Sequence, residues 1–532
     1  MFLLLQWVAG MGAVAWLLAH LARLLRDSVW TPLRIHKAMK AQGVKGPPFK
    51  LFYGNQPDIV RMLADVSSSP LNLSHDILPW ILPYYTNWRK IYGETLLYWF
   101  GSAAILTIAD PEIMKEVLCN KFGHFPKVEG PAAVRDLFGD GLVLATGEKW
   151  AKERRILNHG FQLTKVKAMV EMMAQLTSKM LDKWDILMGD KAKESLAIEI
   201  EAQEYYRNLT ADIIAHTAFG IDYEAGKAVF ELQYQQRKIL RQARVVVQWP
   251  GRSLLPTPTN WRRWKIKNQV EGGLRKMIET RLHYESKRHG SQENDLLGLM
   301  ISAYKGELQG NQRHLRMSIP DIVDECKTFF FAGHDTTATL LTWTTMLLAM
   351  YPDWQDRVRA EVVQVCGSKP PDSEILGQLK LVDMVLYETL RLYPVVPQIM
   401  RGAKKDISLG KLFIPKGTQL CLLVLAMLHS KQVWGEDANE FNPERFLKGM
   451  ANASEHRSAF LPFSLGPRNC IGQVLAIMEA KVVISMLLQR FRFTLSPGYT
   501  HSPNQVGFVM PKEGVQILVT RADSHLLLPN NI

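Results

Sequence analysis

Eleven residues, Pro462 to Gly472, restrict this chain more than any other stretch, because they place one cysteine among glycines and prolines at tight spacing. Glycine lets the backbone pass close to a flat, bulky group. The apolar run from Val474 to Leu488 has helical spacing, which predicts Cys470 at a helix N-terminus. Unpaired amide groups and the positive end of the helix dipole favour a thiolate there, and Arg468 adds a cation.

A thiolate on such a loop suits a nucleophile, a zinc ligand or a haem-iron ligand. Zinc requires further cysteine or histidine ligands at short spacing, and the loop has none. A nucleophile requires a nearby histidine, whereas the closest upstream one, His456, is fourteen residues away. An axial haem ligand requires only the one sulfur. A buried cysteine in an ordinary turn is the plain structural alternative.

The spacing of this loop resembles the haem-binding loop of the cytochrome P450 family, the haem-thiolate monooxygenases, in the pattern Phe463-x-x-Gly466-x-Arg468-x-Cys470-x-Gly472. The resemblance implies that Cys470 is the axial ligand of the iron in haem b (iron protoporphyrin IX). It also implies a mainly α-helical fold with a small β-rich subdomain, and it extends from residue 49 to about residue 522.

The longest soluble helix that the sequence predicts begins at Ser318, where Asp321 completes a capping box, and ends at Met350 before a proline. Apolar residues surround nearly its whole circumference, which predicts a buried helix. A threonine at position 336 can hydrogen-bond to the carbonyl of residue 332, and a carboxylate at position 335 of an apolar helix needs a partner or a role.

The segment Ala332-Gly333-His334-Asp335-Thr336-Thr337 resembles the oxygen-activation motif of the same family. The resemblance implies that Thr336 and Asp335 deliver protons during oxygen activation. The small residues at 332 and 333 leave room for a flat cofactor, and we expect His334 to lie on the helix surface. A glycine-weakened core helix with a back-bonded threonine is the alternative.

Two further sets of residues match family motifs. Glu388 and Arg391 lie three apart on one helical face, and the resemblance joins them to Arg445 in a structural triad beneath the haem. Indole and guanidinium N–H groups suit carboxylates, and the resemblance implies that haem propionates meet Trp150, Arg154, Arg401 and Arg468. The segments implied to line the substrate cavity are 137–144, 329–336, 395–400 and 505–508.

The N-terminal residues 2–22 are apolar apart from Gln6 and His20, and at about 1.5 Å per residue such a helix spans a bilayer of roughly 30 Å. The basic residues that follow predict a cytosolic catalytic domain. A cleaved signal peptide is the alternative, although no basic segment precedes the run. We expect an anchor at 1–22, a basic, proline-rich linker at 23–48 and a catalytic domain at 49–532, in the endoplasmic reticulum membrane with a single pass.

The composition limits the compartment and the partners. Five cysteines without a pairing pattern suit a reducing compartment. The net charge of +13 comes from scattered basic residues, and no nucleic-acid motif accompanies it, so we expect no nucleic-acid partner. A membrane surface or an acidic protein explains the charge better. The family resemblance implies an NADPH-cytochrome P450 reductase, docked near Lys149, Lys152, Arg155 and Lys448.

The sequence therefore predicts a membrane-anchored haem-thiolate monooxygenase that hydroxylates a hydrophobic small molecule with O2 and electrons from NADPH. The stretches 329–334, 354–356 and 434–439 resemble the plant clan of hormone and terpenoid hydroxylases, which implies a terpenoid, steroid or plant-hormone substrate. Two other functions remain open. A haem-thiolate isomerase or dehydratase needs no acid–alcohol pair such as Asp335-Thr336, and a non-catalytic haem sensor needs no proton relay.

Overall fold

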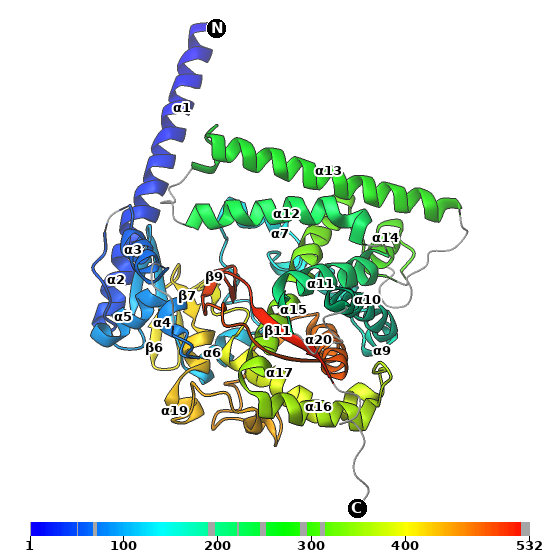
Figure 1. Ribbon diagram of the computed structural model, residues 1–532. Coiled ribbons are helices and arrows are strands. Elements are labelled where there is room, and N and C mark those ends of the chain that lie inside the picture. Colours follow the sequence, from blue (N-terminus) through cyan, green and yellow to red (C-terminus); the bar gives the residue numbers. More distant parts are fainter. Residues whose placement is uncertain are drawn as a thin grey trace, which may run out of the picture.

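Helices form most of the molecule. The computed structural model describes residues 2–50, 52–67, 72–189, 197–220, 223–244, 252–287, 295–308 and 314–522, and Figure 1 shows their arrangement. In chain order the helices are α1 (Phe2–Leu25), α2 (Thr31–Ala41), α3 (Gln56–Ser67), α4 (Leu78–Ile81), α5 (Pro83–Tyr92), α6 (Pro111–Leu118), α7 (Ala132–Phe138), α8 (Gly147–Leu157), α9 (Leu163–Ala168), α10 (Val170–Met188), α11 (Ala202–Phe219), α12 (Tyr223–Arg244), α13 (Pro258–Lys287), α14 (Leu296–Lys305), α15 (Ile319–Met350), α16 (Pro352–Cys366), α17 (Lys380–Leu392), α18 (Val424–Leu428), α19 (Lys431–Trp434) and α20 (Gln473–Arg490).

The strands form four small sheets. Their bounds are β1 (Leu97–Phe100), β2 (Ala103–Ile108), β3 (Ile198–Glu201), β4 (Ile399–Gly402), β5 (Ile407–Leu409), β6 (Leu412–Ile414), β7 (Gln419–Leu422), β8 (Phe491–Leu495), β9 (Pro503–Val506), β10 (Phe508–Pro511) and β11 (Gln516–Arg521). The sheets have the orders β1-β2-β7-β4, β3-β11-β8, β10-β9 and β5-β6. Only the β2–β7 pair is parallel among them. A mainly α-helical fold with a small β-rich part is therefore confirmed.

Helix α15 is the centre of the molecule, and α7, α11, α14, α17 and α20 all pack against it (Figure 1). Its predicted capping box is present, because the Ser318 side chain accepts from the amide of Asp321 and the Asp321 carboxylate accepts from the amide of Ser318. Its side chains are buried from Ile322 to Ala349 with few exceptions, as the apolar circumference predicts. Helix α15 thus lies in the packed core and contacts helices from several parts of the chain.

Two further local predictions are confirmed. The β-rich runs 95–100 and 103–109 predict a hairpin at Gly101-Ser102, and Asp110-Pro111-Glu112 predicts a helix start. The antiparallel hairpin β1–β2 turns at Gly101 and Ser102, with Phe100 paired to Ala103. Helix α6 begins at Pro111, and the Asp110 side chain caps it by accepting from the amide of residue 113 at 2.8 Å.

Other local expectations need correction. The glycines and prolines of 125–146 predict a loop, but this stretch contains α7. The sequence also predicts a basic helix over 150–161, and the structure has α8, which ends at Leu157. The predicted linker 23–48 is helical over α2, and its side chains Ile35 and Met39 are buried against β2 and its neighbours. These side chains follow helical spacing that the basic composition concealed. The apolar and basic stretch 243–255 could contact a membrane surface, but most of it lies outside the described residues.

The N-terminal prediction has a mixed outcome. Residues 2–22 do form one helix, α1, which projects from the body in Figure 1. In the described part of the chain, however, no helix combines the length and the apolar character that crossing a membrane requires. The predicted transmembrane span is therefore not confirmed, and the boundaries of the three predicted parts stay predictions.

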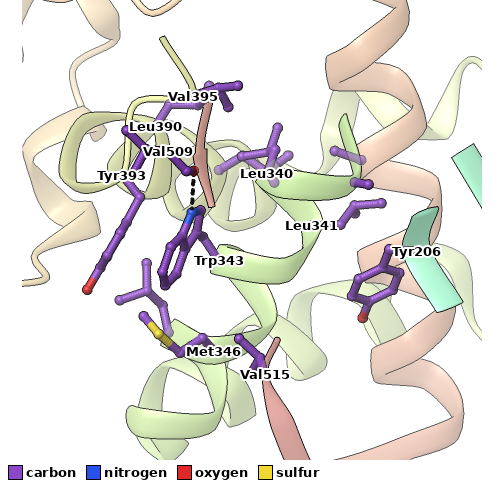
Figure 2. Close-up of a cluster of buried hydrophobic side chains, with 14 of the residues drawn as sticks. Tyr206, Leu340, Leu341, Trp343, Met346, Leu390, Tyr393, Val395, Val509 and Val515 are labelled. Atoms are coloured by element: carbon purple, nitrogen blue, oxygen red, sulfur yellow. Dashed lines mark hydrogen bonds between the residues drawn. The ribbon is translucent and has the colours of Figure 1, made fainter. Parts of the chain in front are cut away.

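A tryptophan joins the central helix to the C-terminal hairpin. Trp343, which is fully buried, donates from its ring nitrogen to the carbonyl of Val509 at 3.0 Å, as Figure 2 shows. The amide of Val509 donates in turn to the carbonyl of Val395 at 2.9 Å, and the Trp343 ring stacks on Tyr393 with centroids 4.3 Å apart. This arrangement fixes two of the predicted cavity segments against α15.

We predict that Trp343→Phe destabilises the protein more than Trp184→Phe does. Both tryptophans are fully buried, but the ring nitrogen of Trp184 has no hydrogen-bond partner among the described residues. Losing the Trp343 donor leaves a buried carbonyl unpaired, which costs about 1–3 kcal/mol. Urea unfolding of the two variants measures the difference in the free energy of unfolding. Equal losses would show that the hydrogen bond contributes nothing beyond ring packing.

Candidate active site

The cysteine loop is held from several directions. The amide of Cys470 donates to the carbonyl of Phe463 at 2.9 Å. Gly466 has a φ of +72°, and a Cβ atom there would lie 2.4 Å from the carbonyl oxygen of Leu118, so only glycine fits. Helix α20 begins three residues after the cysteine, with Gly472 at its N-cap, which is the helix start that the sequence predicts. The loop therefore presents the sulfur from a rigid turn.

The Cys470 side chain is accessible to solvent, yet desolvation by surrounding protein raises the pKa of its thiol above the ordinary value. A hydrogen bond from the Gly472 backbone and the charge of Arg154 oppose this rise in pKa without cancelling it. A metal ion deprotonates a coordinating thiol outright, so a role as an iron ligand is compatible with this raised pKa.

Four cations form one cluster that reaches the cysteine loop. Arg154 on α8 donates to the backbone oxygen and the side-chain oxygen of Asn469, at 2.8 and 3.0 Å. Arg468 donates to the carbonyl of Ala145, and its guanidinium lies 4.7 Å from the ring centroid of Trp150. Arg401 on β4 is buried and donates to the carbonyl of Met400 at 2.9 Å. The fourth cation, Lys127, donates to the carbonyl of Val143.

The electrostatics of this cluster are strongly unbalanced. Burial lowers the pKa of Arg401 to about 10, and burial together with Arg401 and Arg154 lowers the pKa of Arg468 to about 10. Burial, Arg468 and Arg401 lower the pKa of Lys127 to about 7. Within the part of the chain that the structure describes, none of the four cations pairs with a carboxylate. The cluster therefore suits a ligand that carries two carboxylates, as iron protoporphyrin IX does.

Between Glu325 and Ala349, helix α15 is accessible only at Ala332, Gly333 and Thr336 among its described side chains. The hydroxyl of Thr336 donates to the carbonyl of Ala332 at 2.7 Å, as the sequence predicts. A Cβ atom on Gly333 would lie 2.6 Å from the side chain of Ile214 on α11. Gly333 therefore allows α15 and α11 to pack closely, and the expectation that it also makes room for a cofactor stays a prediction.

His334 is buried rather than on the helix surface, which corrects a second expectation. Its Nδ1 atom bonds to the carbonyl of Phe330, and its ring meets Phe230 edge-on with centroids 5.2 Å apart. Burial lowers the pKa of His334 below its ordinary value, and the neighbouring carboxylate of Asp335 opposes this effect. The helix turns this residue toward α12, a contact that local sequence does not reveal.

Asp335 is also buried, with 3% of its surface exposed. Its carboxylate lies 2.6 Å from Arg237 on α12, 3.4 Å from Arg207 on α11 and 3.5 Å from His334. Burial alone would raise the pKa of Asp335, but His334, Arg237 and Arg207 together hold it below the ordinary value. The carboxylate therefore stays ionised and joins three helices.

The predicted structural triad comes together. The carboxylate of Glu388 accepts two hydrogen bonds from Arg391, both 2.7 Å long, and lies 3.6 Å from Arg445. Glu388 and Arg391 are fully buried. Both arginines also donate to backbone carbonyls, those of Leu428, Trp434, Asp437, Ala438 and Glu440. The triad thus fixes the backbone of residues 428–440.

The predicted cavity segments meet at one aromatic side chain. Phe331 on α15 packs edge-on against Phe138 of α7, with centroids 4.9 Å apart, and stacks on Phe508 of β10 at 5.5 Å. Val395 is buried and bonded to the residue after Phe508. The segments 137–144, 329–336, 395–400 and 505–508 thus lie together, and apolar side chains dominate their contact.

Sequence reasoning missed Lys127, Arg207 and Arg237. No motif marks these residues, and each reaches its partner from a distant segment of the chain. Only Lys127 carried a usable signal, because it follows Phe125-Pro126 in a stretch with many glycines and prolines before the helix of Trp150.

Comparison with known proteins gives a consistent result. A family model described as cytochrome P450 matches residues 81–519. Cytochrome P450 734A1 of Arabidopsis thaliana is 41% identical over 93% of this chain and 94% of its own length, and cytochrome P450 709B1 of the same plant is 42% identical over 92% and 94%. Cytochrome P450 CYP72A616 of Paris polyphylla is 40% identical over 96% and 97%. The chain therefore belongs to the cytochrome P450 family of haem-thiolate monooxygenases.

Proposed function

We propose that this protein hydroxylates a hydrophobic small molecule of terpenoid, steroid or plant-hormone type, using O2 and electrons that an NADPH-dependent reductase supplies. The observation that carries the proposal is the cluster of cations without carboxylate partners beside the accessible thiol of Cys470. Haem b offers two carboxylates to the cations and an iron to the sulfur. One ligand therefore satisfies both halves of the site.

The haem, when bound, supplies the oxygen-activating chemistry, and the chain holds it in place. Cys470 would ligate the iron, on a backbone fixed by Phe463 and Gly466. Arg401, Arg468 and Lys127 would donate to the two carboxylates. Trp150 and Arg154 would contribute further donors from α8. The hydrogen bonds from Arg154 to Asn469 attach this helix to the cysteine loop.

Thr336 and Asp335 would control protons. The Thr336 side chain is partly accessible and its hydroxyl makes one hydrogen bond, to the carbonyl of Ala332, so the hydroxyl could reorient and hold a proton. Asp335 must exchange Arg237 or Arg207 for water before it can carry a proton toward Thr336, because both ion pairs favour its charged form. This acid–alcohol pair favours a monooxygenase over an isomerase or a sensor.

An apolar substrate fits the cavity segments. Phe138, Phe331 and Phe508 form one aromatic cluster among these segments, in which Phe331 and Phe508 are buried. Burial of apolar surface contributes roughly 25 cal/mol per Å², so hydrocarbon ring systems gain most from this lining. Compounds that bind should shift the spin state of the haem iron, which offers a direct screen for the substrate.

Helix α1 is proposed to attach the protein to a membrane. Large apolar side chains along it are more than half exposed, namely Trp7, Met11, Val14, Trp16, Leu18, Leu21 and Leu25, and such a surface is favourable in lipid.

The face proposed to dock the reductase, around Lys149 and Lys152, is less basic than the sequence suggests. Lys149 and Lys152 lie 3.3 and 3.6 Å from Asp321, which offsets part of their charge.

We predict that Cys470→His abolishes the red-shifted Soret band of the ferrous carbon monoxide complex, because this band requires thiolate ligation. Cys366→Ser is the matched control, since Cys366 is buried at the end of α16 away from the loop, and it should retain the band. The band in a Cys470→His protein would contradict the assignment of the axial ligand.

We expect Thr336→Ala to bind haem and consume NADPH but to form less product per NADPH, because the accessible hydroxyl is lost. Thr339→Ala is the control. Its hydroxyl makes the same bond to a carbonyl four residues earlier, at 2.7 Å, but is buried. The ratio of product to NADPH is measured with a compound chosen by its spin-state shift. An unchanged ratio in Thr336→Ala would remove this residue from the mechanism.

Deletion of residues 2–22 should move the protein out of the membrane fraction while its carbon monoxide spectrum persists, because α1 projects from the body and contributes no described site residue. Centrifugation and spectroscopy of the truncated protein check both outcomes. A truncated protein that remains with the membrane would show that attachment depends on another surface.

A further inference from the structure

Two glutamates face each other inside the protein. Glu153 on α8 and Glu325 on α15 are both fully buried, and their carboxyl groups lie within hydrogen-bond reach of each other. One oxygen of Glu325 accepts from the amide of Leu142 at 2.9 Å. Both oxygens of Glu153 and the second oxygen of Glu325 have no hydrogen-bond partner among the described residues. Two buried acceptors in contact require a proton between them.

Little positive charge compensates this pair. The ammonium of Lys149 lies 3.8 Å from the Glu153 carboxyl, but it also lies 3.3 Å from both Asp140 and Asp321. Lys152 lies 3.6 Å from Asp321. Helix α14, which packs on α8 and α15, presents Leu-Leu-Gly-Leu-Met-Ile-Ser-Ala over 296–303 and no charge. One lysine shared by three carboxylates cannot neutralise two ionised glutamates.

The pair lies where parts of the haem site meet. Helix α8 carries Trp150 and Arg154. The adjoining loop supplies the carbonyls of Val143 and Ala145, which accept from Lys127 and Arg468, and Leu142 of the same loop bonds directly to Glu325. The glutamate contact therefore sets how α8 and the loop 139–146 sit against α15.

We propose that Glu153 and Glu325 share one proton and act as positioning residues, holding α8 and the loop 139–146 in the geometry that binds the haem carboxylates. The proposal rests on the haem site of the proposed function. The proton lies between the unpaired oxygen of Glu325 and an oxygen of Glu153, because the other Glu325 oxygen already accepts from Leu142.

Stability should depend on pH through this pair. Burial raises the pKa of Glu153 to about 7 and that of Glu325, next to Glu153, well above its ordinary range. In the unfolded chain both carboxyls ionise near 4.5, so the folded state binds more protons above that pH. The free energy of unfolding therefore falls as the pH rises from 4.5 through the folded pKa values. Removal of the shared proton leaves two adjacent negative charges.

The test compares Glu325→Gln, Glu153→Gln and the double variant in the full-length, haem-loaded protein. A glutamine at 325 can still accept from Leu142 and can donate to Glu153, as the protonated glutamate does. Thermal unfolding midpoints between pH 5 and 9 should show a weaker pH dependence in each single variant. The double variant should resemble the singles, because both remove the same proton.

Glu479→Gln is the control. Glu479 is a buried glutamate on α20 whose pKa is raised by desolvation alone, so its effect should add to that of either variant. The second measurement is haem transfer to apomyoglobin at pH 9. We expect transfer from wild type to be about tenfold faster than from Glu325→Gln, which corresponds to one pKa unit of interaction, and Glu479→Gln to behave as wild type.

Additive effects of the two single substitutions, or an unchanged pH dependence in either, would overturn the shared proton. If Glu325→Gln does not fold, Glu153→Gln alone decides the same question. Equal transfer rates from wild type and Glu325→Gln would overturn the positioning role. A protein that is purified without haem would contradict the proposed function instead. The pH dependence of its unfolding midpoint would still test whether the two glutamates share a proton.

Discussion

Charge that is buried without an opposite charge is the constraint on which the rest of this structure depends. Lys127, Arg154, Arg401 and Arg468 converge beside the cysteine loop from four different segments. Burial lowers the pKa of all four groups, so the folded chain holds them at a cost that only a bound anion relieves. The binding of an acidic cofactor and the stability of this region are therefore linked.

Three buried carboxylate sites follow the opposite rule, because each has its cation or its proton. Asp335 is held by two arginines, and Glu388 is enclosed by Arg391 and Arg445. The pair Glu153 and Glu325 lacks such cations and is satisfied only by a proton. Buried ion pairs contribute little net stability, but removing one partner is strongly destabilising. The helices around α15 are thus held in one arrangement by contacts that tolerate little change.

How far the sequence predicted this structure depends on the range of the interaction. The capping box at Ser318, the cap at Asp110 and the hairpin at Gly101 are local, and each was predicted. The environment of His334 and the partners of Asp335 depend on α11 and α12, more than ninety residues away. Neither periodicity nor spacing reports such contacts, which is why Arg237 was missed and His334 was expected on the helix surface.

The family pattern marks the motif residues that the proposed site uses, and the stretch before Trp150 offers a weak signal for Lys127, whereas no sequence pattern marks the glutamate pair. The proposed role of this pair follows from charge and burial alone.

The most direct test of the central claim compares binding of iron protoporphyrin IX with binding of its dimethyl ester, which lacks the two carboxylate charges. Hydrogen bonds between charged groups contribute about 1.5–3 kcal/mol each, so the cation cluster predicts that the ester binds more than about a hundredfold more weakly. Equal affinity for the two compounds, measured by absorbance titration of the haem-free protein, would contradict the account.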